Sequence, residues 1–289
     1  MVPPMYAVAG VSGRTGATTA EALLKQGQKV RVLVRDPAQG EPWLRRHAEV
    51  AVVDLKDSAA LTKALTGMTG ASLLLPPVPD GDDLLAAHGA LTDSMVRAVK
   101  ASGIKSVCFL SSMGAQHPAG TGPVAGLHRA EKALKGAAPS VTFVRAAYFL
   151  ENWGEALMTV LETGELRFFG ATHLKFHQVC ARDIGEAAAT ALAAGAPGTK
   201  VIELAGRENW SPEDVAGVLQ SLLETPVKAV AVPVEKAHEL FLTQGLSENR
   251  ATLLAELYQG MARGHLAFAH PLQLQRGTTP LYDALKTLV

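Results

Sequence analysis

MYAVAGVSGRTG, residues 5–16, is the stretch that decides the fold. A short apolar strand runs into a turn that carries Gly10, Gly13 and Gly16, and a helix pattern begins at about Thr15. These glycines predict a sharp turn off the strand, a close approach of backbone N–H groups to a phosphate, and tight packing of the helix on the strand. Because a helix N-terminus presents unpaired N–H groups and a partial positive charge, we expect a pyrophosphate there. The alternative is a glycine-rich turn without a ligand.

Composition indicates a globular chain and excludes several classes of function. The 289 residues are 48% hydrophobic and 19% charged, and 27 basic residues balance 27 acidic ones. With no basic stripe we expect no nucleic-acid partner, and with only strand-length apolar runs we expect no membrane span. No secretory signal pattern is seen at the N-terminus. Cys108 and Cys180 show no metal-ligand spacing, so we expect no metal site and a reducing, cytoplasmic setting.

Apolar strand patterns alternate with helix patterns through the first half of the chain. This alternation predicts an α/β fold, a Rossmann-type doubly wound parallel sheet with helices on both faces. The further strands are expected at Lys29–Val34, Val50–Val53, Ala71–Leu75, Ser106–Leu110 and Val141–Val144, and the helices at 58–65, 83–102 and 125–136.

The second half of the chain has a looser pattern, which predicts a smaller α+β lobe. We expect a nucleotide-binding domain over residues 1–148, with a later sheet strand near 200–205, and mainly a substrate-binding lobe over 149–289. A helix is expected over 150–162. Ser58, Asp183 and Ser211 are the predicted N-caps of three other helices.

Six motifs, spread in order along the chain, resemble the NmrA-like branch of the atypical short-chain dehydrogenase/reductases. Within that branch the resemblance points to the bacterial NADPH-dependent quinone reductases, and it implies their fold and activity. Other members are NADP-binding regulators and redox sensors with little or no turnover. The motifs are AGVSGRTG (9–16), VRVLVRD (30–36), DLKD (54–57), FLSS (109–112), VRAAYFLENW (144–153) and RGTTPL (276–281).

Arginines at two places favour NADP(H) as the cofactor. Arg35 ends the second strand and Arg14 lies inside the glycine turn, where guanidinium groups suit a ribose 2′-phosphate. We expect Asp36, which precedes a proline, to turn outward. Asp54 matches the family position beside the adenine, although a turn former is an equal interpretation. The predicted cofactor-binding residues are Gly10, Ser12, Gly13, Arg14, Thr15, Gly16, Arg35, Asp54, Leu55, Leu75, Pro76 and Ser111.

The catalytic residues are harder to predict, because the helix after the fifth strand lacks the Tyr-xxx-Lys pair of typical short-chain dehydrogenases. One interpretation takes His128 and Lys132, at i,i+4 spacing, as an altered pair. The other register aligns Glu131 with the family glutamate, so that Leu127 occupies the lysine position and the lysine is missing.

A quinone can take a hydride directly from NADPH in a dry apolar pocket without a strong acid. We expect Tyr148, Phe149 and Asn152, which follow the sixth strand, to line such a pocket, with Asn152 on a carbonyl oxygen; ordinary packing is the alternative for the two aromatic residues. The sequence thus favours an NADPH-dependent reductase of a quinone-like or small carbonyl substrate. The alternatives are a non-catalytic NADP(H) redox sensor and, with less support, an isomerase or lyase. A homodimer or a regulatory protein partner stays open.

Overall fold

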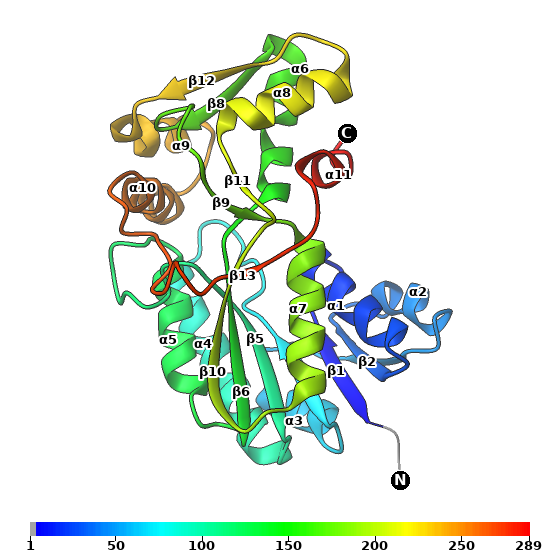
Figure 1. Cartoon of the computed structure of the whole chain (residues 1–289). Helices are drawn as coiled ribbons and strands as arrows, with labels where there is room; N and C mark the ends of the chain where they lie inside the picture. The colour runs from blue at the N-terminus through cyan, green and yellow to red at the C-terminus, as the bar shows by residue number, and fades with distance from the viewer. Residues whose placement is uncertain (1–3) are drawn as a thin grey trace.

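The computed structural model describes residues 4–289, and an eight-stranded sheet is its central layer (Figure 1). The strand order is β13-β10-β6-β5-β4-β1-β2-β3, and every neighbouring pair is parallel. This confirms the predicted α/β class. The strands are β1 (Met5–Ala9), β2 (Lys29–Val34), β3 (Glu49–Val52), β4 (Gly70–Leu73), β5 (Ser106–Ser112), β6 (Ser140–Ala146), β10 (Gly198–Ala205) and β13 (Gln275–Arg276).

Two helical layers cover the sheet, which explains why its strands are apolar on both faces. In β1, Ala7 and Ala9 belong to one core and Tyr6 and Val8 to the other, as the two-residue period of a strand requires. One layer holds α1 (Arg14–Lys25) packed on α7 (Ala181–Ala194), and in the other α4 (Leu84–Ser102) lies between α3 (Ser58–Leu65) and α5 (Val124–Leu134). Between β2 and β3 the chain forms η1 (Pro37–Gly40) and α2 (Glu41–Leu44).

A smaller lobe lies beyond the carboxyl ends of the sheet strands (Figure 1). It contains a three-stranded sheet ordered β11-β9-β7 and a two-stranded sheet of β12 and β8. Trp153, Phe168 and Trp210 belong to its own buried core. The elements are β7 (Tyr148–Phe149), η2 (Leu150–Ala156), α6 (Leu157–Thr163), β8 (Glu165–Phe169), β9 (Phe176–Val179), β11 (Asn209–Trp210), α8 (Pro212–Leu223), β12 (Lys228–Val232), η3 (Val234–Lys236), α9 (Ala237–Thr243), α10 (Glu248–Ala262) and α11 (Leu281–Leu285).

The predicted division at residues 148/149 falls inside β7, and the chain later returns to the large sheet through α7, β10 and β13. The helix expected over 150–162 is instead the 3-10 segment η2 followed by α6. Within residues 4–289, no helix has both the length and the apolar character needed to cross a membrane.

The predicted cap at Asp183 is wrong. Helix α7 begins earlier, at Ala181, because its first N–H group donates to the buried Glu151 carboxylate at 2.9 Å. Asp183 lies in the first turn and its carboxylate turns outward from the helix, accepting hydrogen bonds from the backbone of Thr278 and Thr279.

The predicted cap at Ser58 is also wrong by one residue, because the Asp57 side chain accepts the N–H groups of Ala59 and Ala60. The Ser211 cap is confirmed. Ser211 and Asp214 form a reciprocal capping box at the start of α8.

Candidate active site

The glycine turn between β1 and α1 has the geometry that the sequence predicts. Gly10 has φ +71°, and a Cβ there would lie 2.6 Å from Cδ2 of Leu74. A Cβ on Gly16 would overlap the carbonyl of Gly10, so the helix packs on the turn only with glycine. Gly13 caps α1 and provides no side-chain acceptor, so the first N–H groups of the helix are available to an anion.

A cavity of about 470 Å³ opens over this turn, at the carboxyl ends of β1, β2 and β4. It lies beside the point where the strand order reverses between β1 and β4, the usual dinucleotide position in such sheets. Eight of the predicted cofactor residues line it, which fits a dinucleotide with its pyrophosphate over the turn. They are Gly10, Ser12, Gly13, Thr15, Arg35, Leu55, Leu75 and Pro76.

Four predicted cofactor residues are not part of this lining. Gly16 is buried beneath the turn, and Arg14 is exposed on the first turn of α1. Asp54 is exposed and its carboxylate accepts the N–H of Lys56 at 2.9 Å, as a turn former does. Ser111 lines the neighbouring cavity instead.

The side chains of Arg35 and Asp36, at the end of β2, have different surroundings, as expected. The exposed Arg35 lines the cavity, whereas the Asp36 carboxylate accepts the N–H of Ala38 at 2.9 Å and caps η1. The cavity wall at this position therefore offers a guanidinium to a ligand, while the neighbouring carboxylate is held by its own backbone.

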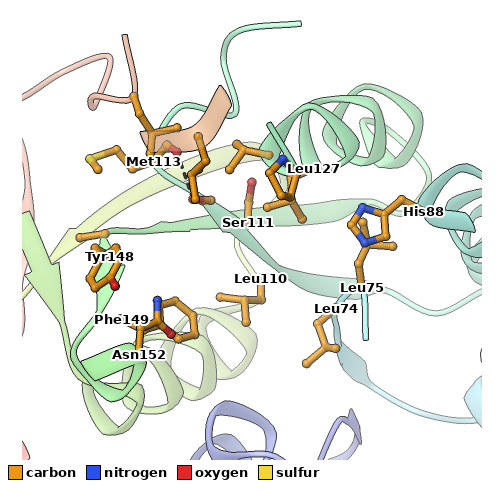
Figure 2. A pocket seen from close by; sticks show the side chains of 16 residues that line it. Leu74, Leu75, His88, Leu110, Ser111, Met113, Leu127, Tyr148, Phe149 and Asn152 are labelled. Carbon is orange, nitrogen blue, oxygen red and sulfur yellow. Dashed lines mark hydrogen bonds between the residues drawn. The ribbon is translucent and has the colours of Figure 1, made fainter. Parts of the chain in front are cut away.

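A second cavity, of about 370 Å³, adjoins the first, and Figure 2 shows the side chains that line it. The two cavities share the side chains of Leu74, Leu75, Leu110 and Phe149. We call this set the shared wall. Most of the remaining lining is apolar, so the second cavity is a mainly apolar site that adjoins the dinucleotide cavity.

Tyr148, Phe149 and Asn152, which the sequence predicts as lining residues, all line this second cavity. Burial, and then the neighbouring Tyr258, raises the pKa of Tyr148 well above its usual value. The Tyr148 hydroxyl therefore stays protonated near neutral pH and is not a base.

The C-terminal part of the chain closes the second cavity through Leu257 of α10 and Leu266. Helix α10 is fastened to the loop after β4. Ser247 donates from its backbone and its hydroxyl to Asp80, at 2.8 and 2.6 Å, and the Asn249 side chain accepts the N–H of Leu84 at 3.1 Å. The lobe thus covers the cavity through polar contacts made at its edge.

Beneath the second cavity runs a buried network of charged side chains. The Ser111 hydroxyl donates to Glu131 at 2.6 Å, and Arg145 donates to both oxygens of Glu131 at 2.9 and 2.7 Å. Glu203 lies 3.6 Å from Arg145 and also accepts the N–H groups at 269 and 270. The network joins β5, α5, β6 and β10 under the site. Within it the Ser111 hydroxyl hydrogen is used in the bond to Glu131.

The structure does not bring His128 and Lys132 into either cavity. Lys132 is exposed, and the His128 ring nitrogen Nδ1 lies 2.9 Å from the carbonyl oxygen of Ala115. The residues of α5 that line the second cavity are Val124 and Leu127. Leu127, which one of the two predicted registers puts at the lysine position, lines the cavity, whereas His128 and Lys132 do not.

His88 of α4 lines the second cavity and was missed in the sequence analysis. It is 8% exposed and lies in a buried stripe with Leu84, Leu91 and Met95. A histidine at i,i+3 and i,i+4 spacing from apolar residues of a helix is the signal that would have indicated it. Burial, and then the charge of Arg250, lowers the pKa of His88 to about 4.

Metal and thiol chemistry have no assembled site in the described part of the chain. Among residues 4–289, no group of three or more His, Cys, Asp or Glu side chains is placed to hold a metal ion. Both cysteines are buried, and burial raises the pKa of Cys108 and of Cys180 to about 12. Neither thiol is a nucleophile near neutral pH.

Two relatives align with nearly the whole chain. The NAD(P)H azoreductase of Xenophilus azovorans is 27% identical over 256 residues, covering 88% of this chain and 86% of the relative. The quinone oxidoreductase 2 of Escherichia coli strain K12 is 27% identical over 268 residues, covering 91% and 90%.

Solved structures with the same fold include two that carry a nicotinamide cofactor. The NADPH-dependent quinone oxidoreductase of Escherichia coli, crystallised with NADPH, has a TM-score of 0.80 at 25% identity, covering 98% of this chain and 99% of that one. The triphenylmethane reductase of Citrobacter sp. with NADP(H) has a TM-score of 0.80 at 22% identity over 98% and 100%, a likeness of fold. The model of the NmrA-like family matches residues 5–265, and the chain belongs to that family.

Proposed function

We propose that this chain is an NADPH-dependent reductase of quinone-like acceptors. The observation that carries the proposal is the shared wall, through which a dinucleotide cavity meets a mostly apolar cavity closed by the lobe. The two 27%-identical relatives, named as an azoreductase and a quinone oxidoreductase, support the same class of reaction.

Each part of the site has a role in this reaction. The glycine turn and the N-terminus of α1 bind the pyrophosphate, and Arg35 holds the ribose 2′-phosphate. When bound, NADPH supplies a hydride at its nicotinamide ring. The apolar lining of the second cavity excludes water and keeps a flat acceptor against the shared wall, while Asn152 orients one of its oxygens. The acceptor takes up the two electrons and the hydrogen of the hydride, and a proton from water completes the hydroquinone.

The test is a fluorescence titration of the protein with NADPH and NADH, followed by addition of 1,4-benzoquinone to the NADPH complex. We expect NADPH to bind at least about tenfold more tightly, a difference of about 1.4 kcal/mol, and to be oxidised when quinone is added. Arg35→Ala should remove most of the preference, whereas Arg45→Ala, a change at an exposed arginine outside both cavities, should leave it intact.

NADPH that binds tightly but survives the quinone would refute the reductase and favour the redox-sensor alternative. A homodimer or a regulatory protein partner is a further part of the proposal. Light scattering with and without NADPH measures the mass of the particle in solution. A cytoplasmic location is likewise proposed, because both cysteines are free thiols.

A further inference from the structure

The His88 imidazole is held in the wall of the second cavity without a hydrogen-bond partner. Its Nδ1 is buried and unpaired within the described residues, and a Cβ on Gly126 of α5 would overlap it. Glycine at this position therefore makes room for the ring between α4 and α5. Nε2 also makes no hydrogen bond within residues 4–289. Unlike Nδ1 it is not buried, so it is open to the cavity that the ring lines.

The surroundings of Nδ1 decide which ring nitrogen carries the proton. With a lowered pKa of about 4, the ring is neutral near pH 7 and has a single N–H. One Cα–H bond of Gly126 takes the direction of the missing Cβ and so points at Nδ1 of His88. This contact is favourable if Nδ1 carries a lone pair and unfavourable if Nδ1 carries a hydrogen. A proton on Nδ1 would be a buried donor without an acceptor, an arrangement that proteins avoid. The hydrogen therefore resides on Nε2, on the cavity side.

Figure 2 shows His88 beside Leu75 at one end of the cavity and Asn152 with Tyr148 at the other. We propose that the Nε2–H of His88 donates a hydrogen bond to an oxygen of the bound acceptor, at the opposite end of the cavity from Asn152. The site then selects flat acceptors that carry oxygens on opposite sides of the ring, as 1,4-quinones do. This inference rests on the proposed function and specifies its substrate class.

The hydrogen bond has a catalytic consequence as well as a binding one. During hydride transfer the acceptor oxygens gain negative charge, so a donor aimed at one of them binds the transition state more tightly than the ground state. His88 keeps its proton in this role. The final proton of the hydroquinone comes from water.

The experiment compares His88→Leu, which removes the donor, with His88→Gln, whose side-chain N–H reaches the place of Nε2. His173→Leu, at an exposed histidine outside both cavities, is the matched control. Calorimetry measures the Kd of 1,4-naphthoquinone for each protein saturated with NADP⁺. We expect His88→Leu to weaken binding about fivefold, and His88→Gln to stay within about twofold of the wild type. The Kd of NADP⁺ and the unfolding temperature serve as controls for folding.

Turnover of 1,4-naphthoquinone gives the second readout, and kcat/KM should fall at least as much as binding in His88→Leu. Equal Kd values for His88→Leu and the wild type, equal weakening by Leu and Gln, or a wild type that does not bind the quinone would each overturn the inference. A wild type that binds the quinone without oxidising NADPH would refute the proposed function alone, since the ratio of Kd values still decides the role of His88.

Discussion

Removing the charge of Glu131 tests the buried network under the site. Arg145 donates to both Glu131 oxygens, and the two side chains are only 11% and 9% exposed. The hydrogen bonds that Arg145 donates to Glu131, and then the charge of Glu131, raise the pKa of Arg145. A guanidinium stays protonated in proteins, so Arg145 keeps its charge when Glu131 is changed. Glu131→Gln leaves this guanidinium buried with Glu203 as its remaining carboxylate, 3.6 Å away.

The expected loss follows from that geometry. Breaking a buried ion pair by removing one partner costs about 3–5 kcal/mol. We expect about 3 kcal/mol, the lower end, because Glu203 still compensates part of the charge and glutamine keeps one oxygen for Arg145 or Ser111. At about 2–4 °C for each kcal/mol in a chain of this size, the unfolding temperature should fall by about 6–12 °C.

Urea denaturation followed by circular dichroism gives the free energy of unfolding, and calorimetry gives the unfolding temperature. The matched control is Glu165→Gln, because Glu165 pairs with Arg167 at 2.9 Å on the surface, with 39% and 59% of the side chains exposed. Such exposed pairs contribute about 0–1 kcal/mol. If Glu131→Gln costs no more than Glu165→Gln, the network does not stabilise the fold in the way inferred here.

Three further predictions concern the turn, the C-terminal segment and the cavity. Gly16→Ala should abolish tight NADPH binding and lower stability, because its Cβ overlaps the Gly10 carbonyl; a fluorescence titration and a thermal melt measure both effects, and unchanged binding contradicts it. Asp183→Ala should cost about 3 kcal/mol in urea denaturation, since it removes the acceptor of the Thr279 hydroxyl and two backbone N–H groups, whereas Asp183→Asn should cost less. The pKa of His88 is lowered from 6.5 to about 4 on folding, so the unfolded chain binds the extra proton and stability is lost as pH falls from 6.5 towards 4. Relative to His88→Leu, the wild type should lose up to about 1.4 kcal/mol per pH unit in that window, and parallel pH profiles of the two proteins would contradict this.

The parts of the fold that sequence predicts are those fixed by local chemistry. A strand covered on both faces must be apolar throughout, so β1, β2 and β5 are visible as runs of residues. The two-residue strands β7 and β13 have no such run, because pairing with a distant neighbour defines them. The cap prediction at Asp183 fails because a distant group, Glu151, accepts the first N–H of α7, whereas the prediction at Ser58 fails by one residue because the adjacent Asp57 is the cap.

The candidate site likewise has one part that local sequence predicts and one part that depends on distant contacts. Part of the dinucleotide half lies in one local motif, where Gly10 has φ +71° and a Cβ on Gly16 would overlap the backbone of Gly10. The acceptor half is assembled from α4, η2 and α10, and the proton position on His88 depends on Gly126 of another helix, which no local pattern encodes. Since the two cavities meet only at the shared wall, residues of the acceptor half can change without altering dinucleotide contacts. Substitutions at His88 or Asn152 should therefore change which acceptor is reduced and leave NADPH affinity intact, which is how one cofactor site can serve many acceptors within a family.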